Sequence, residues 1–139
     1  MPRLSSGYVI AGAYADKIRR TLFAQLRDLI RESKEWSSRI AYSAAQLNKV
    51  LFEILVKGLN VDRGDVVRIR IEYEIDEAAK EVKWKWDTLE VEVFRRESPE
   101  KVKKVVDEYK SKASEMAVAR VAYDLVKKGE TEDGDVVYA

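Results

Sequence analysis

The sequence predicts an α+β fold: a small antiparallel sheet packed against two N-terminal helices, with a long C-terminal helix used in oligomerisation. Two stretches before residue 60 repeat apolar residues at helical spacing, and an alternating stretch after residue 66 predicts a β-hairpin. A Ser-Pro pair then begins a third helical pattern. The chain has 139 residues, 46% of them hydrophobic, which is enough for one core. We expect residues 1–97 to form the α+β domain, to which residues 98–139 add a helix and a tail.

Residues 7–14 predict the first strand, because Tyr8 and the residues after it are apolar on both faces. A strand of that kind is central in its sheet or covered on both sides. Gly7 and Gly12 indicate a close approach to the backbone, most often by a packed helix and less often by a ligand.

The first helix is expected to begin at Ala15 or Asp16. Its buried side consists of apolar residues at helical spacing: Ile18, Leu22, Phe23, Leu26, Leu29 and Ile30. Arginines occupy another face with few acidic residues between them: Arg19, Arg20, Arg27 and Arg31. Such a face is either a solvated helix surface or a surface for a polyanion.

The second helix is expected to begin after Ser33, whose hydroxyl caps it, and to stop at Gly58 in the left-handed conformation. Its apolar side consists of Trp36, Ile40, Ala44, Leu47, Leu51, Ile54 and Leu55. A second line of residues, here called the polar ridge, combines cations, a ring and an amide: Arg39, Tyr42, Gln46 and Lys49. This combination fits phosphate contacts interleaved with base stacking. The alternative is that Tyr42 is half-buried at the edge of the core.

A strand that begins after residue 64 alternates apolar and charged residues, so one of its faces is buried. After a loop at residues 77–80, the return strand loses its alternation. Trp84 and Trp86 are in step with Val82, whereas Leu89 and the apolar residues after it are not. Either the strand bulges near Asp87 and Thr88, or both tryptophans point away from the core.

The cross-strand charges favour the bulge. Opposite charges then face each other in three pairs: Lys85 and Glu72, Lys83 and Glu74, and, past a one-residue bulge, Arg68 and Glu90. This register predicts a neutralised outer face of the hairpin. It also places Trp84 opposite Tyr73 and Trp86 opposite Ile71, on the core side, unless that side extends into a cleft or a subunit contact.

The C-terminal helix is expected to begin with Ser98 as its cap and Pro99 at its first position, and to reach about Lys128. Its apolar seam steps by four and three residues, through Val102, Val106, Tyr109, Ala113 and Met116. A helix about 45 Å long exceeds what so small a domain covers. We therefore expect its far half to contact another subunit, with a helix that lies across a large sheet as the alternative.

The composition excludes several kinds of chemistry. Without Cys or His, the chain has no thiolate nucleophile, no Ser-His triad and no ordinary zinc site. No Walker motif, GxGxxG motif or carboxylate cluster with metal spacing is present, so we expect no enzyme, no cofactor and no metal. The charged fraction of 37%, with few amides, resembles hyperthermophile proteins. No signal-peptide core or long apolar run occurs, which favours a cytoplasmic protein without a membrane partner.

The net charge of +1 hides a segregation along the chain. Residues 1–60 carry a net charge of +5, residues 61–97 carry −3 and residues 98–139 carry −1. A basic N-terminal part indicates a surface for a polyanion. An excess of this size also arises from ordinary scatter.

The opening strand and helix read Gly7-Tyr8-Val9-Ile10-Ala11-Gly12-Ala13-Tyr14-Ala15-Asp16-Lys17-Ile18-Arg19-Arg20. With the helical pair, the hairpin and the last helix, this sequence resembles the archaeal ThermoDBP-related proteins, which bind single-stranded DNA. The resemblance implies sequence-independent binding by a homo-oligomer. In ThermoDBP a leucine zipper makes a homodimer. The seam of the last helix here lacks that zipper and looks more like the related group, which implies a homotetramer that encloses the strand.

The residues and the resemblance together predict a nucleic-acid-binding domain over residues 1–97. Phosphate neutralisation and base stacking would occur in a groove or tunnel of the oligomer. The candidate binding residues are Tyr8, Tyr14, Arg19, Arg20, Arg27, Arg31, Trp36, Arg39, Tyr42, Gln46, Lys49, Trp84 and Trp86. Two alternatives stay open: an RNA-binding protein of the same shape, and an oligomeric interaction scaffold without nucleic-acid affinity.

Overall fold

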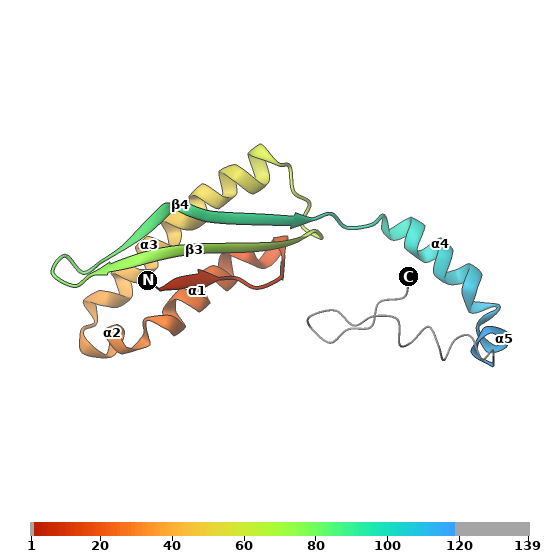
Figure 1. The fold of residues 1–139 in the computed structure, drawn as a ribbon, viewed down its shortest axis with the longest axis horizontal. Coiled ribbons are helices and arrows are strands. Elements are labelled where there is room, and N and C mark those ends of the chain that lie inside the picture. The colour runs from red at the N-terminus through yellow and green to blue at the C-terminus, as the bar shows by residue number, and fades with distance from the viewer. Residues whose placement is uncertain (1, 119–139) are drawn as a thin grey trace. The chain divides into compact units, whose positions relative to one another are not determined.

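β3 (Val66–Asp76) is the central strand of a four-stranded antiparallel sheet (Figure 1). Its odd-numbered residues from Val67 to Tyr73 are buried and the residues between them are charged, so the core lies on one face of the sheet. The other strands pair with β3: β4 (Glu81–Phe94) on one edge, and β1 (Arg3–Ser5) and β2 (Val9–Ile10) in succession on the other. This structure, a computed structural model, describes residues 2–118.

Two helices supply the apolar side chains that cover the buried face of the sheet. The helical elements before β3 are, in chain order, η1 (Ala11–Ala13), α1 (Tyr14–Gln25), α2 (Arg27–Glu32), α3 (Glu35–Phe52) and the π-helical η2 (Glu53–Gly58). α3 packs against both α1 and β4, and α1 also contacts β1 (Figure 1). The chain is therefore α+β with an antiparallel sheet, as predicted.

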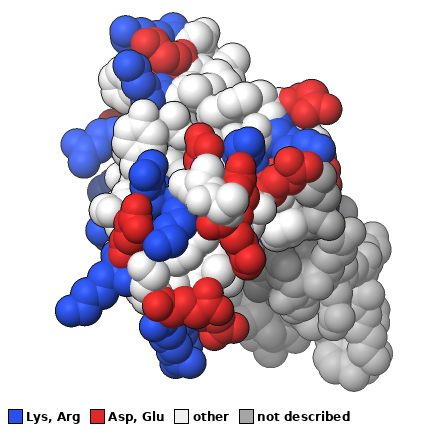
Figure 2. All heavy atoms as spheres, turned by 90° about the vertical axis from the view of Figure 1, so that its left-hand side faces the viewer, with Lys and Arg blue, Asp and Glu red and all other residues white. Residues whose placement is uncertain are grey.

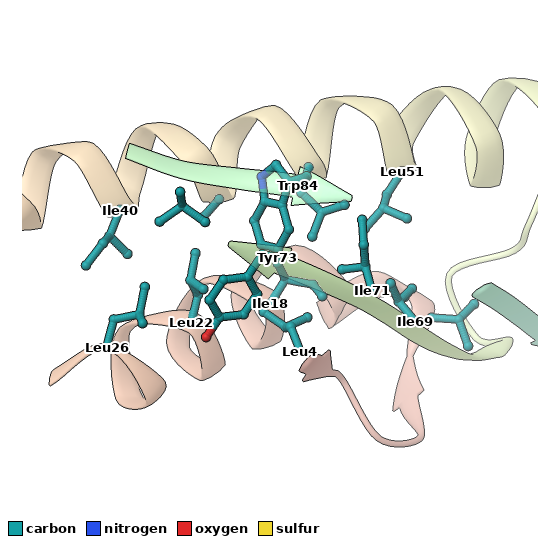
Figure 3. Packing of buried hydrophobic residues seen from close by; sticks show 14 of the residues in the cluster. Leu4, Ile18, Leu22, Leu26, Ile40, Leu51, Ile69, Ile71, Tyr73 and Trp84 are labelled. Carbon is teal, nitrogen blue, oxygen red and sulfur yellow. The ribbon is translucent and has the colours of Figure 1, made fainter. Parts of the chain in front are cut away.

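The core lies between these helices and the sheet (Figure 3). The predicted apolar sides are confirmed: Ile18 and Leu22 of α1 are buried, and so is the stripe of α3 from Trp36 to Leu51. The rings of Tyr73 and Trp84 meet edge to face, with centroids 5.6 Å apart. The hydroxyl of Tyr73 donates to the Gln25 amide oxygen at 2.8 Å, which satisfies its polar atom inside the core.

The predicted first strand over residues 7–14 is wrong. Only Val9 and Ile10 pair with β3, and they lie at the edge of the sheet, with Ile10 exposed. Ile10 pairs with Val66, the first residue of β3, so the strand pairing ends at this point. The chain therefore turns through η1 into α1, and the amide of Ala11 bonds to the Asp65 carbonyl at 2.7 Å.

The two predicted helices form with small differences. The first is interrupted at Leu26. The second begins at Glu35, with Lys34 rather than the predicted Ser33 at its N-cap, and the Ser33 hydroxyl accepts from the Glu35 amide at 3.3 Å. It stops at Gly58 as expected, but the left-handed residue is Asn60, with φ of 50°. This shift follows from the π-helical last turn. The Leu59 amide bonds to the carbonyl of Ile54, five residues earlier, so the chain reverses later than it would after an α-helical turn.

The predicted register of the hairpin is confirmed near its loop, where Trp84 pairs with Tyr73 and Lys85 with Glu72. The bulge is also present, but it is larger than the single residue expected. Between the Glu72–Lys85 and Arg70–Glu90 pairs, Ile71 alone opposes residues 86–89. Arg68 consequently faces Glu92 rather than Glu90.

The outer face of the hairpin is neutralised, as predicted. Cations and carboxylates on this face form ion pairs within 4 Å: Arg68 with Glu92, Arg70 with Glu90, Lys83 with Asp76 and Lys85 with Glu74. Because each cation there already has an acidic neighbour, this face is a poor track for phosphates.

The described residues from 97 to 118 belong to a second unit and contain α4 (Pro99–Lys110) and α5 (Ala113–Ala117). The Ser98 hydroxyl accepts from the Lys101 amide at 3.3 Å, which confirms the cap. The expected continuous helix is interrupted at Ser111, whose hydroxyl donates back to the Glu108 carbonyl at 2.9 Å. The rest of the predicted helix, to Lys128, lies outside the described residues. No helix within residues 2–118 is long and apolar enough to cross a membrane.

Candidate nucleic-acid interface

A groove lies between α3 and β4 and has a volume of about 470 Å³. α3 contributes Tyr42, Ala45, Gln46, Lys49 and Val50 to its lining, and β4 contributes Trp86. Three of the four polar-ridge residues thus meet one of the predicted stacking tryptophans. The groove, here called the α3–β4 groove, brings together four of the predicted binding residues: Tyr42, Gln46, Lys49 and Trp86.

The position of the polar ridge follows from how α3 packs. Its apolar stripe faces the sheet, and two hydrogen bonds hold its flank against β4. The Trp84 indole N–H donates to the Ser43 carbonyl at 2.8 Å, and the Ser43 hydroxyl donates to the Val82 carbonyl at 3.4 Å. The ridge residues next to this flank are therefore presented beside β4 and stay exposed to solvent.

Two aromatic rings of the groove are open to solvent. Tyr42 is 66% exposed and Trp86 is 45% exposed. Trp86 is the first residue of the bulge, past the last regular pair of Lys85 with Glu72, and it lines the groove with residues of α3. The register predicted from the sequence includes this outcome, because it places Trp86 on the core side of the hairpin unless that side extends into a cleft.

Lys49 is the cation of the groove. Among residues 2–118, no carboxylate lies within 4 Å of its ammonium group. Arg39, at the start of the ridge, lies 3.8 Å from Glu35, which also accepts from Lys80 at 3.0 Å. The hydrogen bond from Lys80 is the largest cause that holds the pKa of Glu35 below its ordinary value. Glu35 is therefore ionised at neutral pH and offsets part of the positive charge there.

The arginines of α1 and α2 do not line the groove. Arg20 pairs with Asp16 at 2.9 Å, Arg31 lies 3.9 Å from Asp28, and the Arg19 guanidinium lies 4.9 Å from the Phe23 ring centroid. The Arg27 side chain has no ion pair within the described part of the chain. Exposed pairs of this kind contribute little, so phosphates compete with them readily.

Two predicted stacking residues, Trp36 and Trp84, lie in the core and are not available to bases. They are 3% and 8% exposed. Trp36 belongs to the apolar stripe of α3, and Trp84 stays in register with Tyr73 ahead of the bulge.

The two remaining predicted tyrosines lie elsewhere. Tyr14 begins α1 and is half-buried against the core, where burial raises its pKa. Tyr8 is exposed, but its ring contacts Phe94 edge to face at 5.5 Å, and the Arg68 guanidinium lies 4.7 Å from its centroid. Neither residue lines the α3–β4 groove.

The charge excess of residues 1–60 is not gathered into one acid-free surface in the view of Figure 2, where cations and carboxylates are interspersed. A second hollow, of about 450 Å³, borders the bulge and is lined by Arg3, Thr88, Leu89 and three acidic residues: Glu72, Asp87 and Glu90. These carboxylates repel phosphates. The α3–β4 groove is therefore the better polyanion site of the two.

Sequence reasoning missed two lining residues, Ala45 and Val50. Val50 lies four residues after Gln46 and therefore continues the polar ridge rather than the buried stripe. The signal in the sequence was an apolar residue on a ridge that is otherwise polar.

Comparisons with solved structures give three informative similarities. ApeThermo-DBP-RP2 bound to ssDNA dT10 is 39% identical, with a TM-score of 0.77 over 98% of this chain and 61% of that chain. PfuThermo-DBP-RP1 is 31% identical, with a TM-score of 0.60 over 84% of this chain and 78% of that chain. ThermoDBP, a single-stranded DNA-binding protein, shares the fold at 20% identity, with a TM-score of 0.50 over 68% of this chain and 84% of that chain.

No curated protein matches this chain. The family described as "ThermoDBP-related, archaea" matches residues 4–82, which is more than half of the sequence and includes α1, α3, β3 and the hairpin loop. The matched region supplies every α3 residue of the groove. With this match and the two solved Thermo-DBP-RP structures that resemble it, the chain belongs to the ThermoDBP-related family of archaea.

Proposed function

We propose that this chain binds single-stranded DNA without sequence preference, and that the α3–β4 groove is its binding site. The observation that carries the proposal is the groove itself, in which two exposed rings lie beside Lys49, which has no carboxylate within 4 Å in the part of the chain that the structure describes. The similarity to apeThermo-DBP-RP2, which was solved bound to ssDNA dT10, supports it.

Each lining residue has a chemical role in the proposal. Unpaired bases stack on Trp86 and Tyr42, and stacking is tolerant of sequence because every base has a π face. Lys49 contacts a phosphate, and Val50 covers the apolar underside of a base. A duplex keeps its bases stacked on one another, so it does not offer them to the rings.

The arginines of α1 and α2 form an outer set of phosphate contacts in this proposal: Arg19, Arg20, Arg27 and Arg31. They are exposed, and their ion pairs are weak enough to exchange for phosphates. Arg39 links this set to the groove, because it lies on the polar ridge one turn before Tyr42.

We also propose that the chain acts as a homo-oligomer, a tetramer rather than a dimer. α4 supports assembly into an oligomer, since its apolar residues Val102, Val106 and Tyr109 are exposed within the described residues. An apolar helix face of this kind is commonly covered by another subunit.

Tryptophan fluorescence tests the binding site. Trp36 and Trp84 are buried, so an oligo-dT strand should quench mainly Trp86. The exchange Trp86→Leu should remove most of the quenching and raise Kd by about 5- to 100-fold, the range that one stacked base supplies. Absence of binding by the unaltered protein at low salt would rule out the proposal and leave the interaction scaffold.

Competition decides the kind of nucleic acid. Single-stranded DNA, RNA and duplex DNA of equal length should be added to the complex of the protein with labelled oligo-dT. We expect the unlabelled single-stranded DNA to displace the label and the duplex to be ineffective, because its bases are not free to stack. Stronger displacement by RNA would assign the groove to RNA instead.

A further inference from the structure

The bulge in β4 is the most irregular part of the sheet, and it sits beside the proposed site. Four residues, 86–89, oppose Ile71 alone, while the pairing on both sides of them is regular. An uninterrupted ladder would put Trp86 opposite Ile71, which is fully buried. The bulge therefore decides whether this tryptophan belongs to the core or to the groove.

One hydroxyl holds the bulge together. The Thr88 hydroxyl donates to the Lys85 carbonyl at 2.6 Å and closes a short turn around Trp86. The same oxygen accepts from the Glu72 amide at 2.9 Å, so it substitutes for a backbone acceptor that the interrupted ladder lacks. Thr88 is only partly exposed. Its two hydrogen bonds connect the bulge to Lys85 and Glu72, which form the last regular pair on the side of the hairpin loop.

We propose that Thr88 is a positioning residue for DNA binding, which acts by fixing the backbone turn that presents Trp86 to the α3–β4 groove. The inference rests on the proposed function. Thr88 itself does not line that groove, because it borders the acidic hollow instead. Its contribution to binding is therefore indirect and passes through the orientation of the Trp86 ring.

The experiment uses three variants of the full chain. Thr88→Val keeps the shape of the side chain and removes both hydrogen bonds, whereas Thr88→Ser keeps the hydroxyl. The control Thr21→Val makes the same exchange on α1. Binding to oligo-dT is measured together with the ¹⁹F spectrum of 5-fluorotryptophan-labelled protein, in which Trp36, Trp84 and Trp86 give one resonance each.

We expect Thr88→Val to raise Kd about 3- to 10-fold, less than the complete loss of one stacking ring. The Trp86 resonance should move or broaden, while those of Trp36 and Trp84 stay in place and report an intact core. The salt dependence of Kd should not change, since no phosphate contact is removed. Thr88→Ser and Thr21→Val should behave like the unaltered protein in both measurements.

Several outcomes overturn the inference. Unchanged affinity of Thr88→Val, when Trp86→Leu binds weakly, would show that the bulge needs no hydroxyl to present the ring. A loss of affinity in Thr88→Ser as large as that in Thr88→Val would show that the hydroxyl is not the group that positions the ring. If Thr88→Val does not fold, Thr88→Ala, which also removes both hydrogen bonds, takes its place in the comparison with Thr88→Ser. If the unaltered protein does not bind DNA, the proposed function fails, and an unmoved Trp86 resonance would separately refute the positioning role.

Discussion

Trp84 and Trp86 are two residues apart and have different surroundings. Trp84 pairs with Tyr73, is buried and donates its indole N–H to a carbonyl of α3. Trp86 is exposed in the α3–β4 groove. The sequence identifies both as aromatic residues on one side of a strand, but burial depends on a shift of register between them. Residue type alone therefore could not separate the core ring from the candidate binding ring.

The polar ridge was easier to predict. Helical spacing depends only on the α3 sequence, and its apolar stripe fixes which side faces outward. Tyr42, Gln46 and Lys49 consequently lie together as expected. Their meeting with Trp86 depends on how α3 packs on β4, which local periodicity does not specify.

Lys49 gives a prediction about salt dependence. The exchange Lys49→Gln should reduce the slope of log K against log salt concentration by about 0.7, because one phosphate contact is lost on a single strand. Lys57→Gln is the matched control, since the Lys57 ammonium lies 3.3 Å from Glu53 and outside the groove. Titrations from low to moderate salt measure both slopes. Equal slopes for the two variants would remove Lys49 from the site.

Asp65 gives a prediction about acid stability. Its buried carboxylate accepts from the Arg96 amide at 2.7 Å and the Asp62 amide at 2.8 Å, and it pairs with Arg95 at 3.2 Å. These bonds, with the Arg96 amide first, hold the pKa of Asp65 below its ordinary value of 3.8. The stabilisation is therefore complete above that value and is lost as pH falls through the folded pKa.

The measurement is the melting temperature as a function of pH. Asp65→Asn should melt at a lower temperature than the unaltered protein at pH 7, and the difference should shrink as pH falls below about 4. Asp28→Asn, whose carboxylate is exposed, serves as the control. A difference that persists unchanged in acid would mean that packing rather than charge is lost.

At the scale of elements, long periodic segments were predictable and short ones were not. α1 and α3 each contain several turns whose apolar residues agree with one another. The stretch at residues 7–14 is equally apolar, but its backbone bonds depend on where β3 begins. The size of the bulge is set by the pairing of Arg70 with Glu90 beyond it. Opposite charges can be matched across the two strands in more than one register, so charge alone does not predict that size.

Removal of residues 86–88 tests whether the bulge serves the fold. The deletion would bring Leu89 opposite Ile71 and leave the Arg70–Glu90 pair and all later pairs in place. We expect a free energy of unfolding within about 1 kcal/mol of the unaltered value, because the ladder becomes continuous. DNA affinity should fall as far as in Trp86→Leu. Denaturant melts and oligo-dT titrations check the two parts, and an unfolded deletion variant would show that the bulge is structural.

At the scale of the whole molecule, the charge arithmetic overstated how far the surface is segregated. Four of the ten cations of residues 1–60 pair with an acid on the same helix: Arg20 with Asp16, Arg31 with Asp28, Arg39 with Glu35 and Lys57 with Glu53. Composition reports the sum of such charges and not their neighbours. The net charge of residues 1–60 therefore indicated a polyanion site but did not show which residues form it.

Truncation after residue 97 tests the role of the second unit. Residues 1–96 form their own compact unit, so we expect residues 1–97 to fold and to keep the groove. The truncated chain should be monomeric by light scattering and should bind long oligo-dT at least about tenfold more weakly, because linked sites are lost. The full chain is the control. A truncated chain that assembles as the full chain does would remove α4 from the subunit contact.

Within the described residues, β4 pairs only on the side of β3, so its 14 residues leave a long row of backbone groups open on the other side. A straight strand of that length invites addition of a strand from another molecule and thereby aggregation. The interruption at residues 86–89 bends the row, and Lys83 and Lys85 add charge beside it. The feature that exposes Trp86 thus also makes this open edge a poorer template for a strand from another molecule.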